Sequence, residues 1–210
     1  MRAYLCNHAT FALWMSGQRA RARARLAEAI AGYTDLDDPW GRGVSYFIEG
    51  ELEEAEGNLA AAAAAFAEGS MLMRHLDDAF GVTWTTLRLG YVRLQEGDLV
   101  QARPSLKESL GFARDLGHTT FVLLALAGCA ALAADGGHET AAVRLFGRAA
   151  RLLEAPPEYS GLTSVAARAA CGPRLSRLRR HVPPERFQAE WSAGHALTLE
   201  QAITLALDTA

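Results

Sequence analysis

The stretch that decides the fold is residues 39–78, PWGRGVSYFIEGELEEAEGNLAAAAAAFAEGSMLMRHLDD. It opens with Pro39 after Asp38, which is typical of a helix start, because an aspartate side chain caps free N–H groups and proline has none to satisfy. Gly57 is expected to end this helix, since glycine readily adopts the left-handed conformation of a helix C-terminus. Asn58 is then expected to cap a second helix. The stretch therefore predicts a pair of antiparallel helices and lacks the alternating apolar pattern of a strand.

The same features recur along the chain at a spacing of 40 residues. Each copy carries a small residue, then a turn glycine, then an alanine, then a large apolar residue. The small residues are Thr10, Gly50, Gly90 and Ala130, the glycines Gly17, Gly57, Gly97 and Gly137, the alanines Ala22, Ala62, Ala102 and Ala142, and the large residues Leu26, Phe66, Leu106 and Phe146. Small residues let two helices approach closely, and the large ones fill the remaining space. This register predicts four helix-pair repeats, about 1–38, 39–78, 79–118 and 119–157.

Residues 158–210 depart from the repeat and are expected to form a C-terminal helical cap. Pro156–Pro157 breaks the pattern ahead of this segment. A helix over about 160–181 is predicted to be interrupted near Gly172–Pro173, because proline clashes with the preceding turn. Residues 198–201, TLEQ, match the capping box, in which the first and last side chains satisfy free N–H groups at a helix start. A cap of this kind gives a repeat array the polar outer end that it needs.

Composition and motif content argue against several classes of function. The net charge of −3 and the pI near 6.1 lack the basic balance of a nucleic-acid-binding domain. Lys107 is the only lysine and lies outside any phosphate-binding loop, so no nucleoside triphosphate site is expected. The six histidines show no metal-binding spacing, and no motif of a serine or cysteine nucleophile is present. We therefore expect a protein that is not an enzyme and that holds no cofactor or metal.

Cysteine use and hydropathy indicate the compartment. Cys6, Cys129 and Cys171 are odd in number and far apart, which favours free thiols in a reducing environment. No window of the sequence is apolar for long enough to form a membrane-spanning helix. Both observations predict a cytoplasmic protein.

The order small–x6–Gly–x4–Ala–x3–large, found at Gly50, Gly57, Ala62 and Phe66, resembles the tetratricopeptide repeat. The 40-residue length resembles the longer-helix repeats of large bacterial transcriptional regulators: the LuxR-type ATP-dependent activators, the maltose-regulator type and the actinobacterial antibiotic-regulatory proteins. The stretches AVRLFGRAARLL (142–153) and LTLEQAITLAL (197–207) resemble the end of the repeat region in those proteins. The chain thus resembles one domain of such a regulator, or a short relative of it, without the NTPase and helix-turn-helix domains that can flank this region.

The resemblance implies an all-α, right-handed superhelix of antiparallel helix pairs that serves as a non-catalytic protein-interaction or regulatory module. In that family the first helix of each repeat lines a concave groove. The matching positions are Tyr4, Asn7, Phe11, Trp14, Met15, Val44, Phe47, Glu51, Glu54, Trp84, Leu87, Tyr91 and Gln95. We expect this groove to bind a protein partner, a neighbouring regulator domain or, as the alternative, a small-molecule inducer, with the two carboxylates favouring a cationic or hydroxyl-rich group. The competing interpretation is that the aromatic residues belong to the core and face the next repeat.

A second candidate surface is the arginine-rich set Arg174, Arg177, Arg179, Arg180 and Arg186. Such a patch suits an acidic partner domain or DNA phosphates, and the negative net charge of the chain favours the partner domain. A plain solvated face is the alternative to both. No direct contact with nucleic acid or with a membrane is therefore expected from this segment.

Overall fold

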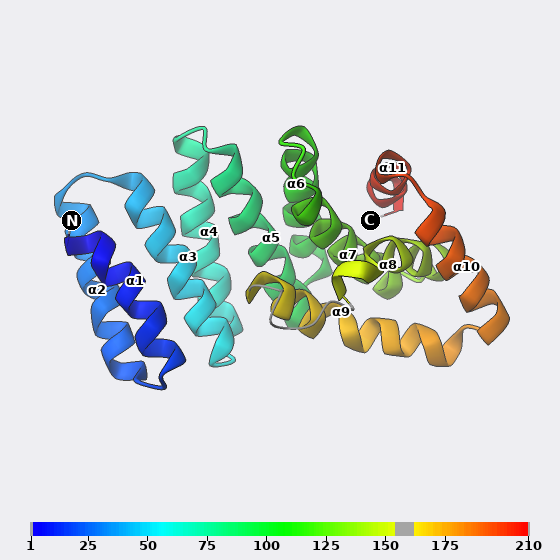
Figure 1. Cartoon of the computed structure of the whole chain (residues 1–210), viewed down its shortest axis with the longest axis horizontal. Coiled ribbons are helices and arrows are strands. Elements are labelled where there is room, and N and C mark those ends of the chain that lie inside the picture. The colour runs from blue at the N-terminus through cyan, green and yellow to red at the C-terminus, as the bar shows by residue number, and fades with distance from the viewer. Residues whose placement is uncertain (1, 154–161, 210) are drawn as a thin grey trace. The chain divides into compact units, whose positions relative to one another are not determined.

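A computed structural model describes the backbone of residues 2–153 and 162–209 and the side chains of residues 6–150 and 165–209. The described residues form eleven α-helices and no strand, which confirms the predicted all-α fold (Figure 1). The helices are α1 (Arg2–Met15), α2 (Arg19–Asp35), α3 (Pro39–Ala55), α4 (Leu59–His75), α5 (Ala79–Glu96), α6 (Leu99–Asp115), α7 (Thr119–Asp135), α8 (Glu139–Leu153), α9 (Leu162–His181), α10 (Pro184–Ala196) and α11 (Leu199–Thr209). In this described part, no helix is both long enough and apolar enough to cross a membrane.

The helix starts follow the 40-residue interval of the sequence. The helices α2, α4, α6 and α8 begin at residues 19, 59, 99 and 139, and α3, α5 and α7 begin at 39, 79 and 119. Glycine makes one set of turns possible, because φ is positive, between 77° and 83°, at Gly17, Gly57, Gly97 and Gly137. A second set of positive-φ turns, which the sequence pattern does not predict, lies at Asp37, Asp77 and Gly117.

Side-chain caps fix several helix starts. Asp38 accepts a hydrogen bond from the first turn of α3 at 2.9 Å, as predicted. The capping box is also confirmed, since the Thr198 N–H donates to Gln201 Oε1 at 2.9 Å and the Gln201 N–H donates to Thr198 Oγ1 at 3.2 Å. The prediction for Asn58 is wrong. Its side chain caps no backbone N–H and instead donates to Glu53 Oε2 at 2.8 Å.

Small residues meet large ones between neighbouring helices, as the repeat pattern predicts. A Cβ atom at Gly50 would lie 2.7 Å from the Phe66 ring, and one at Gly90 would lie 2.6 Å from Leu106 Cγ. Both large side chains are completely buried. The glycines are therefore required by close helix approach, and the bulky side chains fill the space that the missing Cβ atoms leave.

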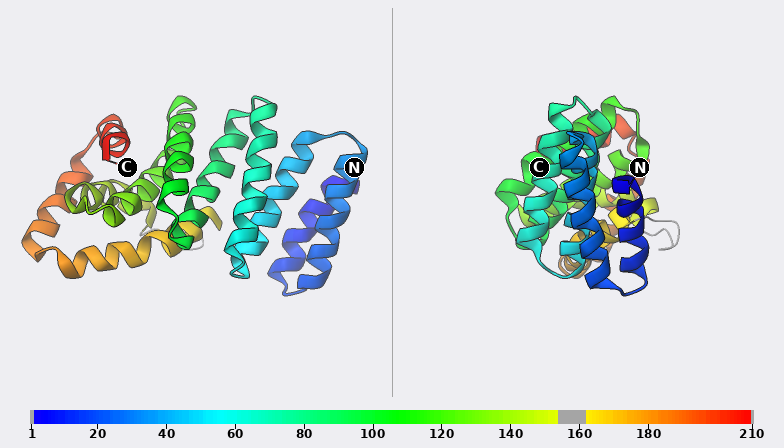
Figure 2. Two further views of the ribbon diagram at one scale, coloured as in Figure 1. Left: turned by 180° about the vertical axis from the view of Figure 1, so that it is seen from behind. Right: turned by 90° about the vertical axis from the view of Figure 1, so that its left-hand side faces the viewer.

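The helices divide into two compact units, residues 1–85 (the N-terminal unit) and residues 86–210 (the C-terminal unit). The N-terminal unit holds α1 to α4 and the start of α5, and the C-terminal unit holds the rest of the chain. In the C-terminal unit, α9 packs against α7 and α8, and α10 packs against α8 (Figure 2). The predicted boundary between repeats and cap, at residues 157–158, lies outside the described residues.

Helix α9 continues through Gly172 and Pro173, so the predicted interruption is wrong. Proline cannot donate a backbone hydrogen bond to the turn that precedes it. The carbonyl that loses its donor is that of Ala169, four residues before the proline. Arg174 Nη1 donates to the next carbonyl, that of Ala170, at 2.7 Å, and the packing of α9 against α7 and α8 supports the helix across the proline.

Candidate functional site

An apolar groove lies in the N-terminal unit, between α1, α2 and α3. It encloses about 480 Å³ and is lined by Asn7, His8, Phe11, Tyr33, Trp40, Val44 and Ile48. Small-molecule and peptide-anchor sites have volumes of roughly 300–1,000 Å³ and combine apolar walls with a few polar groups. The groove has both properties, since its two polar side chains from α1 stand among aliphatic and aromatic ones.

The floor of the groove is held by close packing and a buried hydrogen-bond chain. The Tyr33 ring packs directly on the backbone of α3 at Gly41, where a Cβ atom would overlap the ring. Asn7 Nδ2 donates to Ser45 Oγ at 3.0 Å, and the Ser45 hydroxyl donates to the Gly41 carbonyl at 2.9 Å. These contacts tie α1 and α2 to the first half of α3. The floor is therefore fixed before any ligand binds.

The walls of the groove are partly open to solvent. Phe11 is 43% exposed and Trp40 is 49% exposed, while Val44 and Ile48 are half-buried. The indole N–H of Trp40 donates to Asp78 Oδ2 at 3.2 Å, which restrains the ring. An exposed aromatic side chain that is already held in place loses little conformational freedom when a partner covers it.

Three of the predicted groove positions, Asn7, Phe11 and Val44, line this groove. Trp14 is half-buried, and the Arg19 guanidinium lies 5.3 Å from its ring centroid. Other predicted positions lie outside the groove: Met15 is exposed, and Glu51, Glu54 and Gln95 are half-buried. Tyr4 falls outside the residues whose side chains are described.

Four other predicted positions pack against the protein itself. The Phe47 ring contacts the Trp84 ring edge-on, with 3.9 Å between centroids, and lies 5.5 Å from Phe66. The prediction that Tyr91 lines the groove is wrong, because its side chain is completely buried and its hydroxyl donates to the Leu124 carbonyl at 2.6 Å. This burial raises the pKa of Tyr91 and removes its ring from solvent. Leu87 is also completely buried, so for these two positions the core interpretation is correct.

The sequence pattern does not single out His8, Tyr33, Trp40 and Ile48, which complete the groove. Ile48 follows Val44 by four residues and so lies on the same face of the helix. This spacing could have predicted Ile48 as a groove residue. Tyr33 comes from a second helix, which the resemblance does not place at the groove. Trp40 stands at the start of α3, where nothing in the sequence indicates which way the ring turns.

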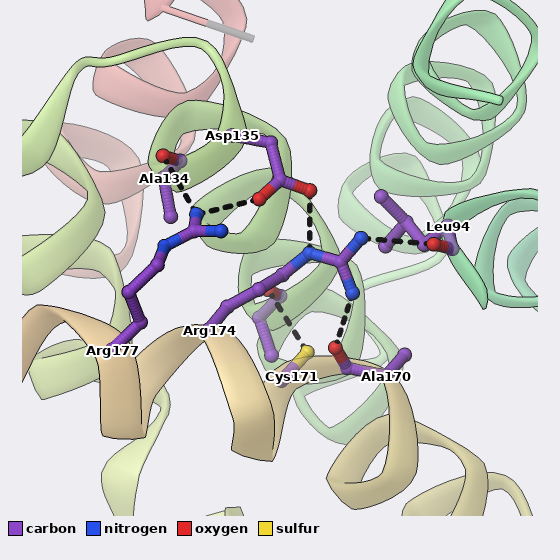
Figure 3. A network of polar contacts seen from close by, with 8 residues as sticks. Leu94, Ala134, Asp135, Ala170, Cys171, Arg174 and Arg177 are labelled. Carbon is purple, nitrogen blue, oxygen red and sulfur yellow. Dashed lines mark hydrogen bonds and ion pairs between the residues drawn. The ribbon is translucent and has the colours of Figure 1, made fainter. Parts of the chain in front are cut away.

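Two arginines of the predicted basic patch, Arg174 and Arg177, bind other parts of the protein (Figure 3). Arg174 Nε donates to Asp135 Oδ2 at 2.6 Å, and its Nη2 donates to the Leu94 carbonyl at 2.8 Å. Arg177 Nη2 donates to the other oxygen, Asp135 Oδ1, at 2.6 Å, and to the Ala134 carbonyl at 3.1 Å. Carbonyl groups at a helix C-terminus lack helical partners. The two arginines therefore join α9 to the ends of α5 and α7.

The other three arginines of that set are dispersed. The Arg179 guanidinium lies 5.5 Å from the Trp191 ring centroid and 5.8 Å from that of Phe187, a cation–π arrangement. Arg186 Nη2 donates to Thr140 Oγ1 at 2.8 Å, and Arg180 is exposed. The arginines thus make several local contacts, while the side chains of Arg177, Arg179, Arg180 and Arg186 remain exposed.

The buried cysteines are poor candidates for covalent chemistry. Burial raises the pKa of Cys129 and of Cys171 to about 12 in each case. The thiolate is the reactive form of cysteine, and these thiols stay protonated near neutral pH. Among the residues that the structure describes, no group of three histidine, cysteine, aspartate or glutamate side chains is arranged to hold a metal ion.

The two units differ in charge. Residues 1–85 contain seven arginines against twelve aspartates and glutamates, a net charge of −5, whereas residues 86–210 contain fourteen basic and twelve acidic residues, a net charge of +2. The open groove therefore belongs to the acidic unit.

Comparisons of the chain with protein-family models, with curated proteins and with solved structures found no match.

Proposed function

We propose that the chain is a non-catalytic binding module that takes a segment of a partner protein into the groove of its N-terminal unit. Its repeats are of the tetratricopeptide type, stacked as helix pairs in a right-handed superhelix, and it acts in the cytoplasm as part of a bacterial transcriptional regulator. The 40-residue register and the order of small residue, glycine, alanine and large residue support this assignment.

The observation that carries the proposal is the pair of half-exposed aromatic rings, Phe11 and Trp40, beside a fixed floor. Complete burial of a phenylalanine side chain is worth about 1.5–3 kcal/mol relative to exposure. Covering the exposed half of each ring therefore contributes on the order of 1 kcal/mol. Aromatic side chains in prepared pockets are also where binding energy concentrates in protein interfaces.

A small-molecule sensor is the second candidate function. The groove volume of about 480 Å³ favours it, because this size suits a compact effector as well as the side chains of a peptide. His8 and Asn7 would then supply the polar contacts. The two functions place different ligands in the same groove.

A display selection tests the proposed function. A library of random peptides is selected on the wild-type chain and then measured on two variants. One is Phe11→Ala/Trp40→Ala, and the matched control is Met71→Ala/Phe80→Ala, which truncates two other exposed apolar residues of the same unit. We expect enriched peptides to bind wild type and control equally and to bind the groove variant at least tenfold more weakly, a loss of about 1.4 kcal/mol, which is less than the ~2 kcal/mol of a single hot spot. The proposal would be refuted if no peptide is enriched, or if the enriched peptides bind the groove variant as tightly as they bind wild type.

The sensor alternative is tested with a library of small organic fragments. A true effector raises the melting temperature of wild type and control but leaves that of the groove variant unchanged, because a ligand stabilises only the form that binds it. Such a result, with a failed peptide selection, would establish the sensor instead of the partner-binding module.

A further inference from the structure

A second pocket lies in the C-terminal unit, lined by the start of α8, the start of α10 and the end of α11. It has a volume of about 400 Å³, within the roughly 300–1,000 Å³ of ligand sites. Its walls differ from those of the apolar groove, because Glu139, Arg144 and Arg186 bring charged groups of both signs to it. Leu205 and Ala141 add apolar surface. We call it the polar pocket, and the function proposed above makes no use of it.

The repeat register does not account for the charges of this pocket. In the earlier repeats, the positions that correspond to Arg144 hold Ala24, Ala64 and Pro104. The second helices of those repeats therefore carry no charged side chain at this point. In the fourth repeat α10 packs against the same helix. The pocket thus belongs to the place where the non-repeating tail meets the last repeat.

Both arginines are held through only part of their guanidinium groups. Arg144 Nε donates to Glu190 Oε2 at 2.5 Å, and Arg186 Nη2 donates to Thr140 Oγ1 at 2.8 Å. A guanidinium group carries five N–H donors. Within the described part of the chain, the Nη groups of Arg144 and the Nε and Nη1 groups of Arg186 make no hydrogen bond. The arginines are therefore restrained by the protein and keep donors for a ligand.

Glu139 supplies the opposite charge. Its side chain is half-buried, and it forms no hydrogen bond or ion pair with any residue that the structure describes. A carboxylate in the first turn of a helix such as α8 is favourable without a partner, because that end of the helix is partly positive. Both of its oxygens can still accept hydrogen bonds. The polar pocket thus holds one carboxylate and two guanidinium groups that are not paired with one another.

We propose that the polar pocket binds a small zwitterion of the amino-acid class, which bridges these separated charges. The ligand carboxylate accepts hydrogen bonds from Arg144 and Arg186, since arginine donors match a carboxylate in geometry and charge. The ligand ammonium group donates to Glu139, and ligand carbon atoms contact Leu205 and Ala141. A plain anion would satisfy the arginines but would bring negative charge close to Glu139, which is unfavourable. This site is separate from the groove and does not depend on the proposed function.

Isothermal titration calorimetry of the full chain with each standard amino acid in turn is the first measurement. The amino acid that binds best is then compared with its amide, which lacks the carboxylate, and with its N-acetyl form, which lacks the ammonium group. The variants Arg186→Gln and Glu139→Gln each remove one charge from the pocket. Arg180→Gln and Glu185→Gln are matched controls, because they make the same changes at exposed residues that do not line it.

We expect an amino acid to bind the wild type saturably, with one site per chain. Both analogues should bind about tenfold more weakly or worse, the least that one hydrogen bond to a charged group implies. Arg186→Gln and Glu139→Gln should weaken binding of the amino acid to the same extent. The matched controls should stay within about twofold of wild type, because exposed charges outside the pocket contribute little.

The analogues separate a direct contact from a distorted pocket. Arg186→Gln should not weaken the amide further, because that ligand has no carboxylate to lose, and Glu139→Gln should not weaken the N-acetyl form further. A variant that only distorts the pocket weakens every ligand, and this result would argue against the assigned contacts.

Three other results would overturn the inference. One is that no amino acid binds. Another is that acetate or inorganic phosphate binds as tightly as the amino acid, because the pocket would then recognise a single charge. The third comes from the groove variant Phe11→Ala/Trp40→Ala, which should bind the amino acid as wild type does. Loss of binding in that variant would place the ligand in the groove and favour the sensor alternative.

Discussion

The variant Gly90→Ala tests how closely α6 packs against α5 in the C-terminal unit. In an exposed helix interior, alanine is more favourable than glycine by about 1 kcal/mol. At Gly90 the added Cβ would lie 2.6 Å from Leu106 Cγ and 2.8 Å from Leu106 Cδ2. Leu106 cannot move aside easily, because a Cβ at Gly128 would lie 2.5 Å from the same side chain on its other side. The substitution therefore forces atoms into a filled space.

The expected magnitude follows from these two opposing effects. Overpacking a well-packed core costs about 1–3 kcal/mol, which exceeds the gain in helix propensity at the upper end of that range. Gly111→Ala is the matched control, since it lies within α6 and an added Cβ would have no neighbour within 4 Å. We expect the control to raise the free energy of unfolding by about 0.5–1 kcal/mol. Gly90→Ala should fall about 1–3 kcal/mol below the control.

Urea denaturation of both variants gives these differences directly. A further variant tests whether Leu106 is the side chain that obstructs the added Cβ atom. In a Leu106→Ala background the obstructing side chain is gone, so Gly90→Ala should become stabilising and resemble Gly111→Ala. If Gly90→Ala stabilises the wild-type chain as much as the control does, or if its effect keeps the same sign without Leu106, then the close approach of α5 and α6 described above is wrong.

Three further predictions concern caps, the arginine contacts and the thiols. Asp38→Ala should lower the free energy of unfolding by about 1 kcal/mol in urea melts, the value of a helix cap, whereas Asn58→Ala should change it by less than half as much, and equal effects would contradict the assigned hydrogen bonds. Arg174→Met should cost about 1.5–3 kcal/mol through lost bonds to charged and carbonyl groups, and a neutral result would exclude that role. Burial raises the pKa of Cys129 and that of Cys171 from 9.0 to about 12, so the unfolded chain loses these protons at lower pH than the folded chain does. The free energy of unfolding should therefore fall as pH rises from 9 towards 12. A Cys129→Ala/Cys171→Ala variant that shows the same decline would refute this cause.

The helix boundaries could be predicted because the signals for them are local. A glycine with positive φ, such as Gly57, or an aspartate that caps the next turn, such as Asp38, acts within a few residues of its own position. The small-to-large packing was predictable for a related reason. The helices that contain Gly50 and Phe66 are joined by a short turn, so their register is set by the sequence between them.

The candidate site was harder to predict because burial depends on distant segments. Tyr91 occupies the same repeat position as Phe11, yet one is fully buried and the other is 43% exposed. Tyr91 is bonded to the Leu124 carbonyl of α7, and α9, which comes from the non-repeating tail, packs against that same helix. Arg174 illustrates the same point, since nothing near it in sequence indicates that Asp135 and the Leu94 carbonyl will receive it.

Asp78 serves two helices with one carboxylate. Its Oδ1 atom accepts the Gly81 N–H at the start of α5, and its Oδ2 atom accepts the indole N–H of Trp40 in the groove wall. An occupant that covers the Trp40 ring thus alters the environment of the group that caps α5. Hydrogen exchange at the single Gly81 amide then becomes a built-in sensor of groove occupancy, readable by nuclear magnetic resonance without any label on the ligand.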